Sequence, residues 1–363
     1  MIADGRAPPL RSVVGAGFTA LAGARAYTLA GSFSHFLLQE RGAERLRALY
    51  RSAGDFPGVY GVPLESLERA WRTFLEQQPL DAAERARAQE RFRRPAIFQK
   101  VCARELAARV AEARGRIYTT PDRAIALLES ACQDDPDEPT FRLDLAEALF
   151  AAGRPADALA AATDVETAPG MTWPLRARAA SLAASVHFHA GSFATAEEAV
   201  RRALAVATDE GEERTGQAKL RALADSSARR TLGRVLFGDS PTRAPDAAVA
   251  LFLITEFARA FPDEALGPYL LARQLAWRDP RLALPQIDRA CPPGQPAGTK
   301  ALAPLFAREC LRMTGETAFR AEDLPRSRAA YLRLRDEAKN EAERLRASDF
   351  LERLDWEEAR RKN

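Results

Sequence analysis

The sequence predicts an all-α protein, and three observations lead to this fold class. Ala, Leu, Arg and Glu dominate the 363 residues, whereas Val, Ile, Thr and Tyr are sparse. Residues of the first group lose little side-chain entropy in a helix, and those of the second group pack better on a pleated sheet. Apolar residues recur at the spacing of a helix face through most of the chain. One pattern of paired helices also occurs twice, with its copies 38 residues apart.

The first part of the chain, residues 1–92, is predicted to form a small helical module. A helix is expected to begin at AGSF (residues 30–33) and to end at Gly42, a residue type typical of a left-handed helix cap. A second helix is expected over residues 43–54. A third follows within residues 62–78, and its apolar face consists of Leu64, Leu67, Trp71, Phe74 and Leu75. The irregular spacing indicates a compact bundle rather than a repeat.

This order of motifs resembles the segment downstream of the zinc site in gluzincin-type (MA-clan-like) metallopeptidases. The resemblance covers about residues 24–76 and rests on AGSF entering a helix, LRALYRSAGDF, a short GVPL and L-x-x-x-W-R-x-F-L. Catalysis in that family requires HExxH, in which two His lie one helical turn apart with a Glu between them, and a carboxylate ligand downstream. His35, His187 and His189 are followed by Phe, Phe and Ala, so none of them can begin this motif. The resemblance therefore implies the tail of such a peptidase, or a relic without its active half.

A repeated helix pair is predicted after residue 93. Residues 141–165 (FRLDLAEALFAAGRPADALAAATDV) combine an apolar first helix, Gly153 in the turn and a second helix rich in alanine. The same pattern returns in residues 179–206 (AASLAASVHFHAGSFATAEEAVRRALAV), with Gly191 in the turn. Residues 123–139 are typical of a second helix that precedes the first complete pair.

Weaker pairs follow, and a polar helix is expected at the end of the chain. The pairs are predicted from residues 246–264, 268–290 and 302–338, with insertions at residues 209–219 and 238–245. In the last pair Asp323–Leu324 replaces the usual glycine turn. Residues 339–363 have a thin apolar stripe formed by Leu345, Leu351 and Leu354, which is typical of a capping helix with an outer face exposed to water.

The repeated pattern resembles tetratricopeptide-like repeat proteins over about residues 97–338. The resemblance implies a superhelix of antiparallel helix pairs that binds a peptide or a protein. The expected organisation is a helical module (1–92), a repeat superhelix (93–338) and a capping helix (339–363). We predict a non-catalytic scaffold for a protein or peptide partner. The candidate partner-binding side chains are Arg142, Arg176, Arg178, Phe188 and Arg229.

The alternative hypothesis makes the chain the C-terminal region of a gluzincin-like metallopeptidase whose zinc-binding half is missing. Such a protein could be attached to a membrane through that missing part or through a partner. Under either hypothesis no catalytic, cofactor-binding or metal-binding residue is assigned in this chain. Residues 15–20 (GAGFTA) match the dinucleotide fingerprint G-x-G-x-x-A, but the βαβ unit that this fingerprint requires is not predicted around them.

The charge balance argues against a nucleic-acid partner. The chain carries 53 basic and 50 acidic residues, and its net charge is only +3. Both signs alternate along the basic stretch 84–95, which lacks the interleaved aromatic residues that stack on bases. A membrane-spanning helix needs about 20 apolar residues in succession, and Arg25 interrupts the apolar stretch 12–38. Without an evident secretory signal, we expect a cytoplasmic location, or else a soluble domain of a membrane-associated protein.

The cysteine pattern predicts reduced thiols. Cys102, Cys132, Cys291 and Cys310 are far apart in the sequence and form no CxxC pair. Each lies in or beside an apolar helical segment, where a thiol behaves as a small hydrophobic group. We therefore expect buried, unpaired cysteines, with neither a disulfide framework nor a zinc knuckle.

Overall fold

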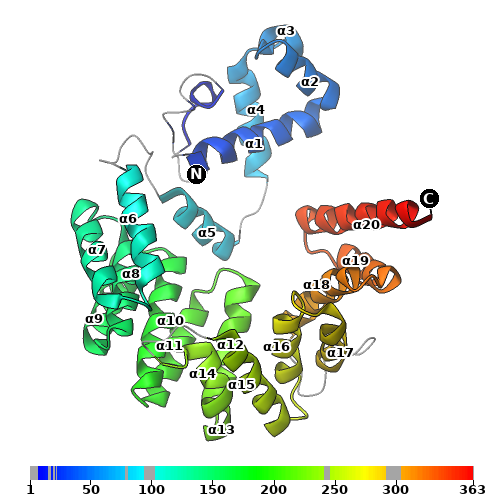
Figure 1. The fold of residues 1–363 in the computed structure, drawn as a ribbon. Helices are drawn as coiled ribbons and strands as arrows, with labels where there is room; N and C mark the ends of the chain where they lie inside the picture. The colour runs from blue at the N-terminus through cyan, green and yellow to red at the C-terminus, as the bar shows by residue number, and fades with distance from the viewer. Residues whose placement is uncertain are drawn as a thin grey trace. The chain divides into compact units, whose positions relative to one another are not determined.

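The structure, a computed structural model, confirms the prediction of an all-α fold built from consecutive helix pairs (Figure 1). It describes residues 7–14, 18, 21, 23–77, 81–93, 103–240, 246–291 and 304–362. Two compact units make up the chain, namely Met1–Leu182 with Ala205–Thr208, and Ala183–Leu204 with Asp209–Asn363. Within the described ranges, no helix combines the length and the apolar character that crossing a bilayer requires. Cys102 and most of the GAGFTA stretch (residues 15–20) lie outside the described residues.

The first unit begins with helices that share one aromatic core. They are η1 (Leu10–Ser12), α1 (Gly23–Arg41), α2 (Ala43–Arg51), α3 (Phe56–Tyr60) and α4 (Leu64–Glu76), followed by α5 (Ala82–Arg93). Trp71 is fully buried in this core, where it lies edge-on to Phe33 with ring centroids 5.9 Å apart. Its indole Nε1 donates a hydrogen bond to Ser32 Oγ at 3.1 Å. The predicted apolar face of α4 is thus directed into the core, with Leu67 and Trp71 as its buried members.

The predicted start of the first helix is wrong. Helix α1 begins at Gly23 rather than at AGSF, so Gly31 lies inside the helix instead of at its start. Alanines before the motif favour helix, and a single internal glycine costs only about 1 kcal/mol. Gly42 directly follows the last residue of α1, as predicted, but its φ of 81° and ψ of 161° lie outside the left-handed helical region expected of such a cap.

The helix pairs of the first unit follow α5. The helices are α6 (Ala103–Arg116), α7 (Pro121–Asp134), α8 (Pro139–Ala151) and α9 (Pro155–Thr167), followed by α10 (Trp173–His189), which continues into the second unit. Small residues at the contact between α8 and α9 are fully buried, as the sequence predicts: Ala146, Ala158 and Ala162. Without bulky side chains at these positions, the two helix axes can approach closely.

The turns of three helix pairs have the same backbone geometry. After α8, Arg154 N donates to Leu149 O and Gly153 N donates to Phe150 O, which is a Schellman motif, and Gly153 has a φ of 75°. Gly191, with a φ of 74°, occupies the same place after α10. In the last pair the residue with positive φ is Glu322, at 66°, which directly precedes the predicted Asp323–Leu324. The motif therefore persists without glycine in the last pair.

We expect Gly153→Ala to lower the free energy of unfolding by about 1 kcal/mol, because a β-carbon disfavours the left-handed region. No atom lies within 4 Å of the added carbon, so the cost is conformational and not a clash. Gly115→Ala is the matched control, because Gly115 lies inside α6 with equally open surroundings, where alanine should stabilise the helix by up to about 1 kcal/mol. Urea unfolding checks both variants. If both substitutions changed the free energy of unfolding equally and in the same direction, the left-handed conformation of Gly153 would not be what sets the cost.

The second unit contains the remaining helices. They are α11 (Phe193–Ala205), α12 (Glu210–Leu223), α13 (Ser226–Ala228), the π-helical turn η4 (Arg229–Gly233), α14 (Arg234–Phe237), α15 (Ala247–Ala260), α16 (Leu266–Leu275), α17 (Pro280–Ala290), α18 (Pro304–Arg320), α19 (Leu324–Asp336) and α20 (Glu341–Lys362). The predicted insertion at residues 209–219 forms most of α12. Asp209 caps this helix by accepting hydrogen bonds from the backbone N–H groups of Gly211 and Glu212.

The apolar stripe of α20 differs from the predicted one. Leu351 and Leu354 are buried as expected, whereas Leu345 is 52% exposed. Six residues of an α-helix turn through about 600°, so Leu345 and Leu351 cannot lie on one face. Phe350 contributes to the contact instead, stacking on Tyr331 with ring centroids 4.5 Å apart.

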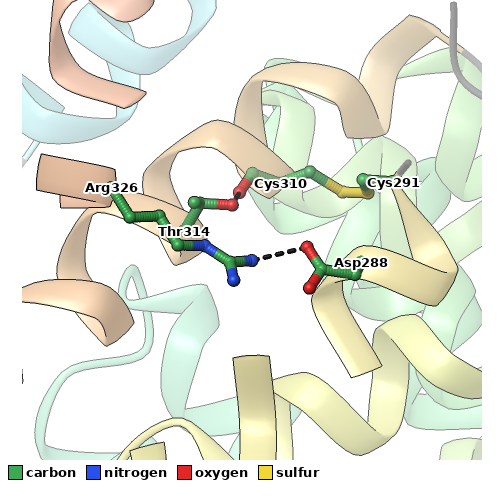
Figure 2. Close-up of a disulfide and its surroundings, with 5 residues drawn as sticks. All are labelled: Asp288, Cys291, Cys310, Thr314 and Arg326. Carbon is green, nitrogen blue, oxygen red and sulfur yellow. Dashed lines mark hydrogen bonds and ion pairs between the residues drawn. A yellow bond between two sulfur atoms is a disulfide. The ribbon is translucent and has the colours of Figure 1, made fainter. Parts of the chain in front are cut away.

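The prediction of reduced thiols is wrong for two of the four cysteines. Cys291, at the C-terminal end of α17, forms a disulfide with Cys310 in α18, and their Cα atoms are 6.3 Å apart (Figure 2). This separation is within the usual range for bridged cysteines. Cys132 is a free, partly buried thiol, and burial raises its pKa, so it is expected to be unreactive.

Candidate functional site

A buried carboxylate holds two arginines from neighbouring helix pairs in the first unit. The side chain of Asp144, on α8, is only 2% exposed. Arg114, on α6, approaches its Oδ2 with Nε at 2.8 Å and Nη2 at 2.7 Å. Arg178, on α10, donates from Nη2 to Oδ1. Asp144 therefore links the first helices of three consecutive pairs, and its charge is compensated from both sides.

A second carboxylate extends this group toward the solvent. Glu147 lies one turn after Asp144 on α8, on the same face of the helix. Its Oε1 accepts a hydrogen bond from the Tyr118 hydroxyl at 2.7 Å, and its Oε2 lies 3.5 Å from Arg178 Nη2. Burial, and then the hydrogen bond to Glu147, raise the pKa of Tyr118, so its hydroxyl stays protonated. We call Arg114, Tyr118, Asp144, Glu147 and Arg178 the arginine–aspartate cluster.

The two arginines of the arginine–aspartate cluster are anchored at a buried carboxylate and are still accessible to solvent. Arg114 and Arg178 remain 50% and 39% exposed, although each is bonded to the buried Asp144. Neither arginine uses its Nη1 for a partner within the described part of the chain. A guanidinium that is held on one side can donate hydrogen bonds to a carbonyl or carboxylate oxygen on the other side. The cluster is therefore suited to binding through the exposed parts of its two guanidinium groups.

The structure places the predicted arginines of the first unit in different surroundings. Arg178 belongs to the arginine–aspartate cluster. Arg142 is exposed on α8, and its Nη2 donates to the carbonyl of Pro136 at 2.8 Å. Arg176 has a buried Nε without a hydrogen-bond partner in the described residues. These three side chains thus form no single group, and their partner-binding role stays a prediction.

The other two predicted residues lie together in the second unit. Phe188 is only 9% exposed and stacks on Phe237 with ring centroids 4.5 Å apart. Arg229, in η4, has its guanidinium 4.2 Å from the centroid of Phe193, which also contacts Phe188. Phe188 is thus a core residue around which the ends of α10, α11 and α14 meet. The partner-binding roles proposed for Phe188 and Arg229 also stay predictions.

A lysine is buried beside this aromatic group. Lys219, on α12, is 8% exposed, and its Nζ lies 5.1 Å from the ring centroid of Phe237. Burial lowers the pKa of Lys219 to about 8, because the charged amine loses its hydration. His189 also contacts Phe237, with its Nε2 3.2 Å from the Phe237 carbonyl oxygen. Lys219 thus places an amine beside the ring of Phe237, where it has little contact with water.

Four members of the arginine–aspartate cluster were not predicted from the sequence. The spacing contains a signal, however, because Arg114 and Arg178 lie 30 and 34 residues from Asp144. Both distances are close to one repeat, so equivalent helix positions bring these charges together. An acidic residue between two apolar ones, Leu143 and Leu145, is a second signal.

A part of the chain resembles a known protein family. Residues 119–168 match the tetratricopeptide repeat family, and this stretch includes α7, α8 and α9 with Asp144 and Glu147. Proteins of curated function gave no match to the chain. The described residues contain no group of three or more His, Cys, Asp or Glu side chains that could hold a metal ion. The resemblance of residues 24–76 to a peptidase tail stays a prediction.

Proposed function

We propose that this tetratricopeptide-like repeat protein is a scaffold that binds a protein or peptide partner through the arginine–aspartate cluster of its first unit. The observation that supports the proposal most directly is the bonding of Asp144, which fixes two half-exposed arginines from α6 and α10. Proteins built from stacked helical repeats use extended surfaces of this kind for binding.

The fixed arginines suit a protein partner on energetic grounds. Arginine is enriched among the interface residues that contribute most to affinity. Immobilising a flexible side chain on binding costs about 0.5–1.5 kcal/mol, and the contact with Asp144 removes much of this cost before the partner arrives. The exposed nitrogens match carbonyl or carboxylate oxygens of a peptide segment. Tyr118, which is 40% exposed, adds accessible aromatic surface to the same cluster.

The proposal predicts that Arg178→Ala weakens partner binding about tenfold, which corresponds to about 1.4 kcal/mol. The wild-type chain would first be used to isolate and identify a partner, and titration calorimetry would then give the Kd of each variant. Arg123→Ala is the matched control, because Arg123 is an exposed arginine on α7 outside the cluster. Circular dichroism would establish that both variants are folded.

An unchanged Kd for Arg178→Ala would contradict the role of the cluster. The same conclusion would follow if Arg123→Ala weakened binding equally, because the effect would then reflect total charge. Failure to isolate any partner from cytosolic or membrane fractions would count against the scaffold itself.

The alternative function rests on a different observation, the peptidase-like order of motifs in residues 24–76. These residues form the helices around Trp71, and their role in such a protein would be structural. An in-frame HExxH encoded upstream of the Met1 codon would favour this alternative over the scaffold.

A further inference from the structure

One exposed face of helix α17 and of the turn before it, in the second unit, carries arginines and no carboxylate. The strongly exposed residues between the end of α16 and the end of α17 are Trp277, Arg278, Arg281, Leu282, Pro285 and Arg289. Positions 281, 285 and 289 are four residues apart, so these side chains follow one stripe along the helix. The buried side chains of α17 lie on the opposite face, and they are Ala283, Ile287 and Ala290. We call the six exposed residues the α17 patch.

The arginines of the α17 patch have no acidic partner in the part of the chain that the structure describes. Arg278 and Arg281 form neither an ion pair nor a side-chain hydrogen bond there. Arg289 donates from Nη1 to the amide oxygen of Gln286 at 3.2 Å, and this partner carries no charge. All three positive charges therefore remain available to an external anion.

The two aspartates of the same segment are directed to other partners. Asp279 caps α17, because its carboxylate accepts a hydrogen bond from the backbone N–H of Leu282 at 3.1 Å. Asp288 Oδ1 lies 2.5 Å from Arg326 Nη2, on α19, so this carboxylate is compensated within the protein (Figure 2). The exposed face is left with a positive charge, which an anionic partner complements.

Two large apolar side chains lie exposed among these arginines. Trp277, in the turn before α17, is 75% exposed, and Leu282, in the first turn of α17, is 59% exposed. The Arg320 guanidinium, from α18, stacks on the indole with its Cζ 3.1 Å from the ring centroid, and it also pairs with Glu316. The stack holds the ring in place while most of the side chain stays in contact with water. An exposed tryptophan and leucine bordered by cations are typical of an interaction surface.

We propose that the α17 patch docks the protein on the anionic surface of a lipid membrane. The three arginines contact the phosphate groups of the lipids, and Trp277 and Leu282 enter the boundary between headgroups and acyl chains. This surface lies in the second unit and acts independently of the arginine–aspartate cluster.

Two properties of the α17 patch favour a lipid surface over an acidic protein. A tryptophan ring is apolar and its N–H needs a polar partner, so tryptophan is enriched at the interface between membrane and water. A helical peptide is bound in a groove, whereas the α17 patch follows the exposed stripe of a single helix. Each arginine near an anionic membrane strengthens binding about fivefold, so three arginines give weak and reversible attachment.

Co-sedimentation of the full chain with lipid vesicles tests the proposal. The chain should bind vesicles of phosphatidylcholine and phosphatidylglycerol in equal parts, and it should bind vesicles of phosphatidylcholine alone much more weakly. Replacing two arginines, in Arg278→Gln/Arg281→Gln, should weaken binding to the anionic vesicles about 25-fold. Arg201→Gln/Arg344→Gln is the matched control and should leave binding nearly unchanged, because it removes the same charge from two exposed arginines that are paired within their own helices. Circular dichroism would establish that both variants are folded.

Tryptophan fluorescence reports whether the indole enters the lipid. Anionic vesicles should shift the emission of the wild type to shorter wavelength, because the Trp277 ring leaves water. Trp277→Phe should abolish this shift. Trp356→Phe is the matched control and should retain it, because Trp356 is 64% exposed on α20, outside the α17 patch.

Equal binding of the wild type to the two kinds of vesicle would overturn the proposal. So would an Arg278→Gln/Arg281→Gln variant that binds anionic vesicles as tightly as the control variant does. If the double variant does not fold, the wild-type comparison of the two vesicles decides, together with the fluorescence shift. The membrane assignment would also be wrong, and an acidic protein the partner, if soluble polyglutamate bound the α17 patch while anionic vesicles left the emission unchanged.

Discussion

Replacing Lys219 with methionine is expected to raise the free energy of unfolding at pH 7 by about 2 kcal/mol. An unfolded lysine has a pKa of about 10.4, and burial lowers that of Lys219 to about 8. Keeping the amine charged in the fold at pH 7 therefore costs about 3 kcal/mol. The contact with Phe237 offsets part of this cost, and methionine keeps the length of the side chain without the charge.

The same substitution should change how stability depends on pH. Below pH 8 the amine is charged in both states, and the full cost applies. Between pH 8 and about 10.4 the unfolded chain holds a proton that the folded protein has lost, so stability contributed by this group rises with pH. The advantage of Lys219→Met over the wild type should accordingly shrink toward pH 10.

Urea unfolding of both proteins at pH 7, 8, 9 and 10 measures this difference. Lys339→Met is the matched control, because Lys339 is exposed and paired with Glu210, and its loss should change stability by about 0.5 kcal/mol at most. A Lys219→Met variant less stable than the wild type, or a difference that does not vary with pH, would contradict the expected cost of burial.

Replacing Asp144 with alanine is expected to lower the free energy of unfolding by about 2 kcal/mol. Breaking a buried ion pair typically costs about 3–5 kcal/mol. A smaller value is expected here because the two arginines that lose their partner are half-exposed and can be hydrated. The substitution also removes the link through which α8 holds α6 and α10.

Asp144→Asn should recover part of this loss, since an amide oxygen can still accept a hydrogen bond from one arginine. Glu112→Ala is the control, because Glu112 forms an exposed ion pair with Arg116 inside α6 and should contribute about 0.3–0.5 kcal/mol. Urea unfolding at neutral pH ranks the three variants. Equal stabilities for Asp144→Ala and Glu112→Ala would show that the buried carboxylate has no special role.

The parts of the fold that the sequence could predict are set by local chemistry. Gly153 and Gly191 end their helices with positive φ because the turn requires it and glycine adopts it freely. Buried alanines mark the close contact of α8 and α9 for a similarly local reason. Glu322 adopts the same turn conformation against its own preference, which only the packing of neighbouring helices can impose.

The parts that could not be predicted depend on contacts between distant segments. Sequence separation says nothing about whether Cys291 and Cys310 meet, because this depends on how α18 packs against α17. The cluster around Asp144 was missed for the same reason, although the distances to Arg114 and Arg178 match a repeat. Leu345 is exposed because six residues of an α-helix turn through about 600°, which places Leu345 and Leu351 on different faces of α20.

The bonding of Asp144 also limits how this chain can be rearranged. Repeat proteins are often treated as stacks of interchangeable modules, which tolerate deletion or duplication of a unit. Here the carboxylate of one repeat is neutralised by arginines of the preceding and the following one. Removing either neighbour would leave a buried carboxylate with half of its counter-charge. The central repeat of the first unit is therefore fixed in its order, and truncations that separate α6, α8 and α10 cannot be neutral.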